Sequence, residues 1–237
     1  MLRALYKTVI PYGVRKWIGA RLKAHFDDQS AYERAKQILP KVPLDEKHLH
    51  NCQVLFDRSA LLSCLPRGGI VAEIGVAQGD FSQLIWQTCE PKELHLIDAW
   101  NSNRFPLPFK ASVRDRFLPE AKEGRIHIHR SLSVDAARNF PDAYFDWVYI
   151  DTDHSYSTTL AELFAYAPKI KPEGLIAGHD YCMGNWVTSY RYGVIEAVHG
   201  FCGTHGWELA YLTLEPSEHQ SFAIRRMPRD SQPKTPE

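Results

Sequence analysis

Short apolar segments alternate with segments of helical periodicity along most of the chain. Aliphatic or β-branched runs and strict two-residue alternation predict seven strands, at 70–74, 94–97, 125–129, 145–150, 175–177, 207–213 and 220–224. Helical spacing of apolar residues predicts helices at 44–65, after 79, at 111–123, after 131, around 160–167 and at 194–205. This alternation predicts an α/β fold with a doubly wound, seven-stranded, mostly parallel sheet. The last two strands have little between them and are expected to form an antiparallel hairpin at one edge.

The predicted sheet domain spans residues 44–226, between two segments of different character. Residues 1–43 form a basic amphipathic N-terminal extension with helical character, and no acidic residue occurs within 1–26. Such a segment can lie on an anionic membrane surface, as a peripheral contact. Docking of its apolar stripe on the domain or on a second subunit is favoured, because amphipathic helices mostly face protein cores. Residues 227–237 are polar and are predicted to be disordered.

The composition narrows the classes of partner and compartment. A chain of 237 residues can bury one substantial core. Its 28 basic and 28 acidic residues cancel, so no strong field favours nucleic acid and a small-molecule partner is expected. Five cysteines without C-x-x-C spacing indicate neither a disulfide framework nor a structural zinc site, which fits a reducing cytoplasm. No apolar run is long enough to span a membrane and no signal-peptide core is present, so a cytoplasmic protein is expected.

A glycine turn follows the first predicted strand. The stretch 70–84, IVAEIGVAQGDFSQL, carries Glu73 within the strand, then Gly75 and Gly79 around the turn. Glycine allows the chain to reverse tightly and lets a ligand approach the backbone. Asp98 ends the next apolar segment. An acidic residue at the end of the second strand is where a doubly wound sheet holds the hydroxyls of a ribose.

Polar residues follow the other predicted parallel strands as well. Ligands of open α/β sheets bind beyond the carboxyl ends of the strands, so these residues are expected to share one rim. They are Ser131, Asp151, Asp153, His154, His179 and Asp180. Asp151, His179 and Asp180 follow two strands expected to be neighbours, and together they could hold a divalent cation. The alternative is structural, with Asp180 capping its loop and His179 making local hydrogen bonds.

Four segments in this order and spacing carry a family resemblance. VAEIGVAQGDFS, LIDAW, DWVYIDTDHSY and LIAGHDY resemble the motifs of class I S-adenosylmethionine-dependent methyltransferases. More narrowly, they resemble the metal-dependent O-methyltransferases, the group of the catechol and macrocin-type sugar enzymes. The resemblance covers roughly residues 44–224, and DTDHSY together with HDY is its specific part. It implies a Rossmann-like methyltransferase fold.

The resemblance also implies roles for individual residues. Cofactor-binding positions would be Glu73, Gly75 and Gly79 near the methionine, Asp98 at the ribose and Ser131 beside the adenine. Metal ligands would be Asp151 and Asp180, with His179 where related enzymes carry an Asp or Glu as often as a His. Asp153 and His154 occupy the two positions that different members use for the general base. The implied cofactors are S-adenosylmethionine and a divalent metal, with magnesium favoured.

The predicted reaction is methyl transfer to a hydroxyl of a small molecule, by in-line attack on the sulfonium methyl group. A cation that binds two acceptor oxygens would lower the pKa of one and orient it. An imidazole such as that of His154 is suited to take a proton near neutrality. The alternatives are a metal-free methyltransferase, a nicotinamide-dependent oxidoreductase and a non-catalytic cofactor-binding protein. The oxidoreductase is disfavoured because the turn reads G-V-A-Q-G rather than G-x-G-x-x-G.

The acceptor and the oligomeric state stay open at this stage, a homo-oligomer included. Aromatic residues of the predicted loops could stack equally well on a sugar ring or on a phenol, and these are Trp100, Trp186, Tyr190 and Tyr192.

Overall fold

The computed structural model of the chain describes residues 14, 39–102, 105–185, 190–215 and 219–228. The chain divides into two compact units, one of residues 1–40 and 184–191 and one of residues 41–183 and 192–237. In the smaller unit, the described part includes a two-residue antiparallel pair, β7 (Gly184–Asn185) with β8 (Tyr190–Arg191). The predicted amphipathic segment 1–26, apart from Val14, and most of the predicted tail 227–237 lie outside the described residues.

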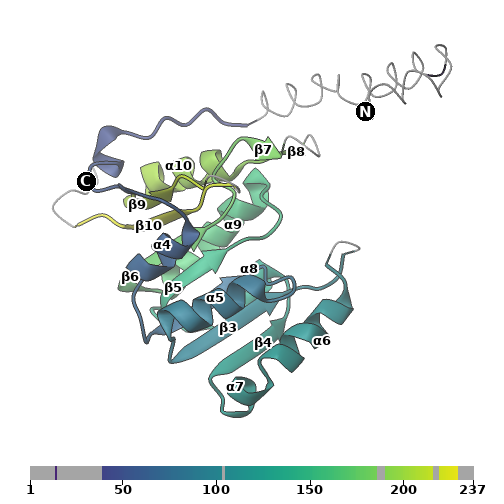
Figure 1. Ribbon diagram of the computed structural model, residues 1–237. Coiled ribbons are helices and arrows are strands. Elements are labelled where there is room, and N and C mark those ends of the chain that lie inside the picture. Colours follow the sequence, from purple (N-terminus) through teal and green to yellow (C-terminus); the bar gives the residue numbers. More distant parts are fainter. Residues whose placement is uncertain (1–13, 15–38, 103–104, 186–189, 216–218, 229–237) are drawn as a thin grey trace, which may run out of the picture. The chain divides into compact units, whose positions relative to one another are not determined.

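The larger unit contains an eight-stranded sheet with helices on both faces (Figure 1). The strands are β1 (Gln53–Leu55), β2 (Ile70–Ile74), β3 (Glu93–Asp98), β4 (Ile126–Arg130), β5 (Phe145–Ile150), β6 (Ile170–Gly178), β9 (Trp207–Thr213) and β10 (Phe222–Arg226). The helices are α4 (Arg58–Cys64), α5 (Asp80–Cys89), α6 (Leu107–Arg116), α7 (Leu118–Lys122), α8 (Ser133–Ala137), α9 (Tyr156–Tyr166) and α10 (Val194–His205), with the 3₁₀ turns η1 (Glu46–His48) and η2 (Ala167–Lys169).

The strand order is β1-β9-β10-β6-β5-β2-β3-β4. β4, β3, β2, β5 and β6 are parallel, and β10 is antiparallel to both β6 and β9. The doubly wound, mostly parallel sheet with a C-terminal antiparallel hairpin is therefore confirmed. Because the order reverses between β2 and β5, their carboxyl ends lie at a topological switch point, where open α/β sheets bind ligands.

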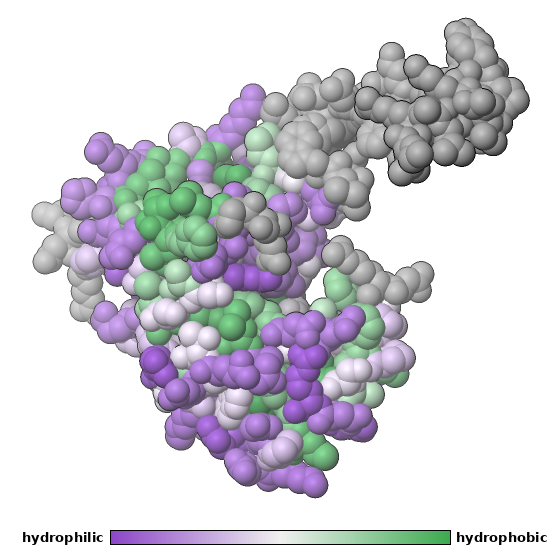
Figure 2. All heavy atoms as spheres, in the orientation of Figure 1, coloured by the Kyte–Doolittle hydropathy of each residue, from purple (hydrophilic) through white to green (hydrophobic). Residues whose placement is uncertain are grey.

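Two hydrophobic cores cover the two faces of the sheet. One packs α8, α9 and α10 against residues such as Ile74 and Val148, and the other packs α4, α5 and α6 against residues such as Val71 and Trp147. Successive strand residues point to opposite faces, so a strand buried on both faces must be apolar at nearly every position. In the view of Figure 2, hydrophilic side chains cover much of the surface over α5, α6 and α7.

The eighth strand corrects the prediction of a single helix over 44–65. Val54 and Leu55 extend β1 along β9 in parallel, with Val54 opposite Leu212. The helix begins only at Arg58, because the Asp57 side chain accepts the amide hydrogen of Ala60 at 2.8 Å and caps it. The hairpin consequently does not lie at the edge of the sheet, since β1 covers β9.

Candidate active site

The carboxyl ends of four parallel strands carry an unusual backbone feature. A non-glycine residue with positive φ follows each of β2, β3, β5 and β6, at Ala77 (49°), Trp100 (43°), His154 (61°) and Asp180 (57°). Left-handed conformation costs a non-glycine residue about 1 kcal/mol or more and tends to concentrate at functional sites. The rim predicted from the sequence is therefore also where the described backbone holds several strained residues.

Gly75 joins the turn after β2 to the loop after β5. Its φ is +92°, and a Cβ atom built on it would lie 1.8 Å from the carbonyl oxygen of Asp151. The Gly75 amide donates to the Ile97 carbonyl at 2.9 Å, and the Asp151 amide donates to the Ile74 carbonyl at 2.7 Å. Only glycine allows this close approach of two backbones. Gly79 completes the turn as the left-handed residue that precedes α5.

Glu73 lies beneath the turn rather than on the open rim. Its side chain is buried, and its Oε2 accepts a short hydrogen bond from the Ser82 hydroxyl of α5. Burial raises the pKa of Glu73 well above its usual value, and the charges of Asp151 and Asp98 act in the same direction, although Ser82 opposes them. The structure thus places Glu73 at the base of the predicted cofactor turn.

Asp98 holds the turn with both carboxylate oxygens. Oδ2 accepts the amide hydrogens of Val76 and Ala77 at 2.9 Å each, and Oδ1 accepts that of Trp100 at 2.8 Å. The Trp100 indole Nε1 donates to the Ala77 carbonyl at 2.9 Å. Trp100 is only 1% exposed, so it braces the turn and does not present a stacking surface to an acceptor. Ser131 follows β4 beside this loop, where its amide donates to the Asp98 carbonyl at 3.0 Å.

Two carboxylates and two imidazoles converge beyond β5 and β6. The His154 Nε2 lies 3.0 Å from the Asp180 Oδ2 and 3.9 Å from the Asp151 Oδ1. The His179 Nδ1 lies 3.6 Å from an oxygen of each aspartate. The donor atoms of Asp151, His154 and Asp180 all lie within 4.8 Å of one another, as a shared cation would require. The structure therefore brings together four of the five residues predicted for metal binding or catalysis.

Burial and charge pull the pKa values of this cluster in opposite directions. Loss of hydration raises the pKa of Asp151, against the lowering effect of the two imidazoles. Burial also favours a neutral Asp180, but hydrogen bonds and charges from His179, His154 and His219 outweigh it and lower the pKa of Asp180 to about 2. For His179, burial acts to lower the pKa, yet Asp180 and Asp151 prevail and raise it. The cluster thus keeps Asp180 ionised at neutral pH.

The fifth residue, Asp153, lies apart from the cluster. It is exposed, and its carboxylate accepts the Ser155 amide hydrogen and the Thr158 hydroxyl hydrogen at 2.9 Å each, at the start of α9. Ser155 itself caps this helix through the Thr158 amide at 3.2 Å. In the structure, Asp153 therefore orders the helix start, whereas His154 faces Asp180.

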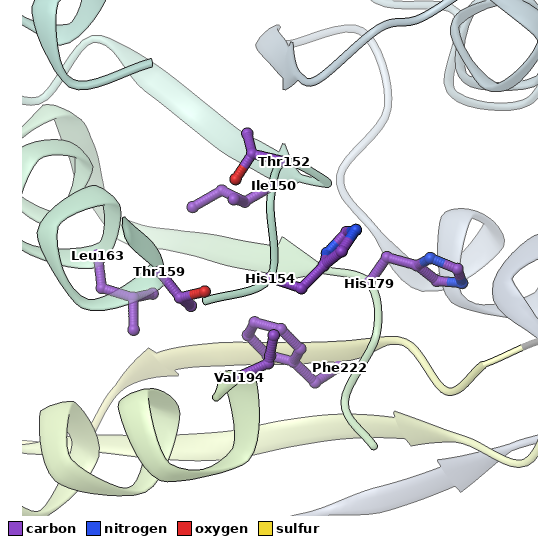
Figure 3. A pocket seen from close by; sticks show the side chains of 8 residues that line it. All are labelled: Ile150, Thr152, His154, Thr159, Leu163, His179, Val194 and Phe222. Carbon is purple, nitrogen blue, oxygen red and sulfur yellow. The ribbon is translucent and has the colours of Figure 1, made fainter. Parts of the chain in front are cut away.

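A small pocket lies beside the two imidazoles (Figure 3). His154 and His179 are on one side, and Leu163 and Thr159 of α9 are on the other. The remaining lining residues are Ile150, Thr152, Val194 and Phe222. Four of the lining residues are apolar and four are polar, so the pocket presents both kinds of surface beside the imidazoles.

Sequence reasoning missed His219 and the placement of Tyr192. The His219 Nδ1 makes a short hydrogen bond with the Asp180 Oδ1, and the Tyr192 ring lies 4.8 Å from the His154 ring and 5.7 Å from the His219 ring. His219 reaches the cluster because β10 pairs antiparallel with β6, a contact between distant segments that the sequence does not state. Phe222 lies opposite Gly178, so residues just before β10 must lie near those just after β6.

Comparison with models of protein families gives a match to the central part of the chain. Residues 72–181 match the family model described as a methyltransferase domain, and this range contains the glycine turn, Asp98 and the whole Asp151 to Asp180 cluster. Comparison with curated proteins gives no match.

Solved structures share the fold at low sequence identity. A Corynebacterium glutamicum protein is 14% identical with a TM-score of 0.55, over 91% of this chain and 98% of its own. A Streptococcus mutans protein assigned as a methyltransferase, in complex with S-adenosylhomocysteine, is 10% identical with a TM-score of 0.53, over 72% and 96%. A Bacillus subtilis tRNA methyltransferase is 12% identical with a TM-score of 0.52, over 75% and 68%. The chain therefore has the Rossmann-like fold of class I S-adenosylmethionine-dependent methyltransferases. Its central segment, residues 72–181, is similar to the methyltransferase domain that the family model describes.

Proposed function

We propose that the protein is an S-adenosylmethionine-dependent methyltransferase that transfers a methyl group to a hydroxyl of a small molecule with the help of a divalent cation. The fold, the methyltransferase-domain match and the S-adenosylhomocysteine bound by a protein of the same fold support the cofactor. The observation that carries the proposal is the contact of Gly75 with the Asp151 carbonyl, because it joins the cofactor turn to the carboxylate cluster.

The residues of the cluster fit a divalent cation. Asp151 and Asp180 offer carboxylate oxygens, and the His179 Nδ1 lies 3.6 Å from an oxygen of each. This donor set suits magnesium, manganese or a borderline transition metal, and it leaves His154 free to act as a base. A bound cation would supply Lewis acidity that lowers the pKa of the acceptor hydroxyl.

The protein's own groups would then manage the proton and the orientation of the acceptor. The ionised Asp180, 3.0 Å from the His154 Nε2, stabilises the imidazolium that forms when His154 takes the proton of the hydroxyl. The Tyr192 ring against His154 limits the movement of that imidazole. Asp98 and Trp100 hold the turn after β2, so that the methyl donor is presented from a fixed backbone.

The same pair of residues favours a second candidate, a methyltransferase without a metal. A histidine oriented by an ionised aspartate at 3.0 Å can act as a general base without any further electrophile. The two candidates share the cofactor and the base and differ in whether Asp151 and Asp180 hold a cation.

Two measurements on the full chain test the proposal in sequence. Isothermal titration with S-adenosylmethionine, S-adenosylhomocysteine and NAD should show binding of the first two and none of NAD. Transfer of a labelled methyl group to a panel of sugars and phenols is then measured with magnesium, with manganese and in excess chelator. Turnover that stops in chelator and returns with metal supports the metal-dependent enzyme. Full activity in chelator would leave the metal-free enzyme, and binding of NAD alone would overturn both.

A further inference from the structure

A second cluster of imidazoles and a carboxylate lies on β3 and β4, toward the amino end of these strands. Glu93 and His95 belong to β3, and His127 and His129 to β4. The register places His127 directly opposite His95. Since residues two apart share one face of a strand, all four point to the face that α8 covers. We call Glu93, His95, His127 and the nearby Tyr144 the amino-end cluster.

The donor atoms of the amino-end cluster have the spacing of a metal site. The Glu93 Oε2 lies 3.8 Å from the His95 Nε2 and 3.6 Å from the His127 Nε2. The Tyr144 hydroxyl lies 3.4 Å from the Glu93 Oε2 and 3.3 Å from the His95 Nε2. In a tetrahedral zinc site with bonds of about 2.0 to 2.1 Å, donor atoms are about 3.3 to 3.4 Å apart. Small shifts of the side chains would therefore complete the coordination.

Neighbouring groups orient these donors. The His95 Nδ1 is 3.0 Å from the His129 Nε2, so the Nδ1 of His95 can carry the hydrogen and its Nε2 is then left with a lone pair for a ligand. The Phe140 and Phe145 rings contact His95 edge-on, with centroids at 5.1 Å and 5.6 Å. A metal-binding histidine typically has this kind of partner on its second nitrogen and an apolar surrounding.

His127 supplies an independent indication. Its Nε2 is buried, and among the described residues it has no hydrogen-bond partner. A buried polar nitrogen without a partner is destabilising, so such atoms usually have an ion or a water beside them. The nitrogen lies within 4.8 Å of the donor atoms of Glu93 and His95.

We propose that Glu93, His95 and His127 bind a zinc-like divalent transition-metal ion, with the Tyr144 hydroxyl or a water as the fourth ligand. Two imidazoles and one carboxylate favour such an ion over magnesium, which prefers oxygen donors. The ion would fasten β4, the edge strand, to β3. The site is separate from the proposed active site, because Glu93 begins β3 and Asp98 ends it, about 16 Å away at 3.3 Å per residue.

Titration of the full chain with Co²⁺ tests the site, because tetrahedral Co²⁺ gives visible absorption bands that Zn²⁺ abolishes by competition. His127→Gln and Glu93→Gln should each weaken binding of Co²⁺ at this site by more than about 100-fold, beyond the loss expected for an outer-shell partner. His129→Gln should weaken it by about 10- to 100-fold. Tyr144→Phe tells whether the fourth ligand is the phenol oxygen or a water.

Control variants separate this site from the active site and from adventitious binding. Asp180→Asn should keep the visible bands, and so should a variant of the exposed His50, His50→Gln. The His127 side chain is 35% exposed on an edge strand, so His127→Gln is expected to fold, and circular dichroism checks this. No tetrahedral bands in the parent chain, or bands that persist in both His127→Gln and Glu93→Gln, would overturn the proposal.

Discussion

The two imidazole and carboxylate clusters lie toward opposite ends of one sheet and are built in different ways. At the carboxyl end, Asp151, His154 and Asp180 lie in loops, and two of the three have left-handed backbones. At the amino end, Glu93, His95 and His127 lie on regular strands at two-residue spacing. A loop can place a side chain at almost any angle but at a cost in backbone strain, whereas strand pairing fixes side chains without strain. This difference is the one expected if the carboxyl-end cluster is the proposed active site and the amino-end cluster is the proposed metal site that joins two strands.

Removal of Asp180 should have the largest effect and should separate the two clusters most clearly. Asp180→Ala is expected to lower methyl transfer by at least about 10³-fold, because it removes a proposed metal ligand and the partner of His154. Affinity for S-adenosylhomocysteine should change little. The matched variant Glu93→Ala should leave turnover within about twofold of the parent. Comparable losses in the two variants would contradict the separation of the sites.

His154→Gln should have the next largest effect. Loss of a general base typically slows a reaction by about 10²- to 10⁴-fold, and the acidic limb of the pH–rate profile should disappear with the imidazole. His50→Gln serves as the control, since His50 is exposed and distant in the chain from the strand ends. Metal affinity measured in parallel distinguishes the roles, because only a ligand variant loses the ion. Unchanged turnover in His154→Gln would remove it from the mechanism.

The stability of the two ends should depend on pH with opposite signs. Beneath the rim, Glu162 is buried and accepts the Thr152 hydroxyl hydrogen at 3.0 Å, and burial raises its pKa to about 7. An unfolded glutamate has a pKa of about 4.3. The folded state therefore retains a proton that the unfolded state releases, and this residue should cost stability as the pH rises from about 4.3 to 7. Glu162→Gln should reduce that loss, by about 2 to 4 kcal/mol at pH 8.

At the amino-end cluster, His95 reverses the sign. Its pKa is lowered, so the unfolded state gains a proton first as the pH falls below about 6.5. Stability contributed by the neutral imidazole should therefore decrease as the pH falls from about 6.5 to 3. His95→Gln should make the free energy of unfolding depend less on pH in this range. Denaturant unfolding across pH measures both changes, with the exposed Glu173→Gln as control. Identical pH profiles for parent and both variants would show that neither group is held neutral by burial.

The smallest expected effect concerns Asp98. Asp98→Ala should weaken S-adenosylhomocysteine binding by about 10- to 150-fold, equivalent to about 1.5 to 3 kcal/mol for hydrogen bonds to a charged group. The loss combines a predicted ribose contact with the release of three backbone amides that hold the turn. Asp115→Ala, an exposed carboxylate of α6, should leave affinity unchanged. Titration calorimetry measures both, and equal affinity in the Asp98 variant would exclude it from the cofactor site.

The parallel core could be predicted from the sequence because its signal is local. Each buried strand is an apolar run, and the polar residue that ends it, such as Asp98 or Asp151, must lie on the carboxyl rim. The features that were missed depend on contacts between residues far apart in the sequence. The helical spacing over 44–65 concealed β1, whose partner strand lies near the other end of the chain. His219 and the pairing of His95 with His127 likewise depend on which strands are neighbours, and a single sequence does not state this.

Asp153 and His154 illustrate a second limit, because residue type alone does not tell which of two adjacent side chains enters the site. The two are adjacent, and residue type alone makes either one suitable as a base. The backbone decides between their placements, since the left-handed conformation of His154 turns it toward Asp180 while Asp153 stays with the amides and hydroxyls that begin α9. Trp100 shows the same limit, because an aromatic residue in a loop can be a ligand platform or, as here, a buried brace.

The pairing of β1 with β9 has a consequence for how the protein emerges during synthesis. The His48 ring hydrogen-bonds the Trp207 carbonyl, and Asn51 binds Glu208, across 159 and 157 residues of sequence. At about 5 to 20 residues per second, the ribosome needs roughly 8 to 30 seconds to make that stretch. Residues 53–55 therefore stay unpaired, next to the exposed Phe56, until β9 has been synthesised. The order of translation thus makes the first strand of the sheet one of the last to be paired.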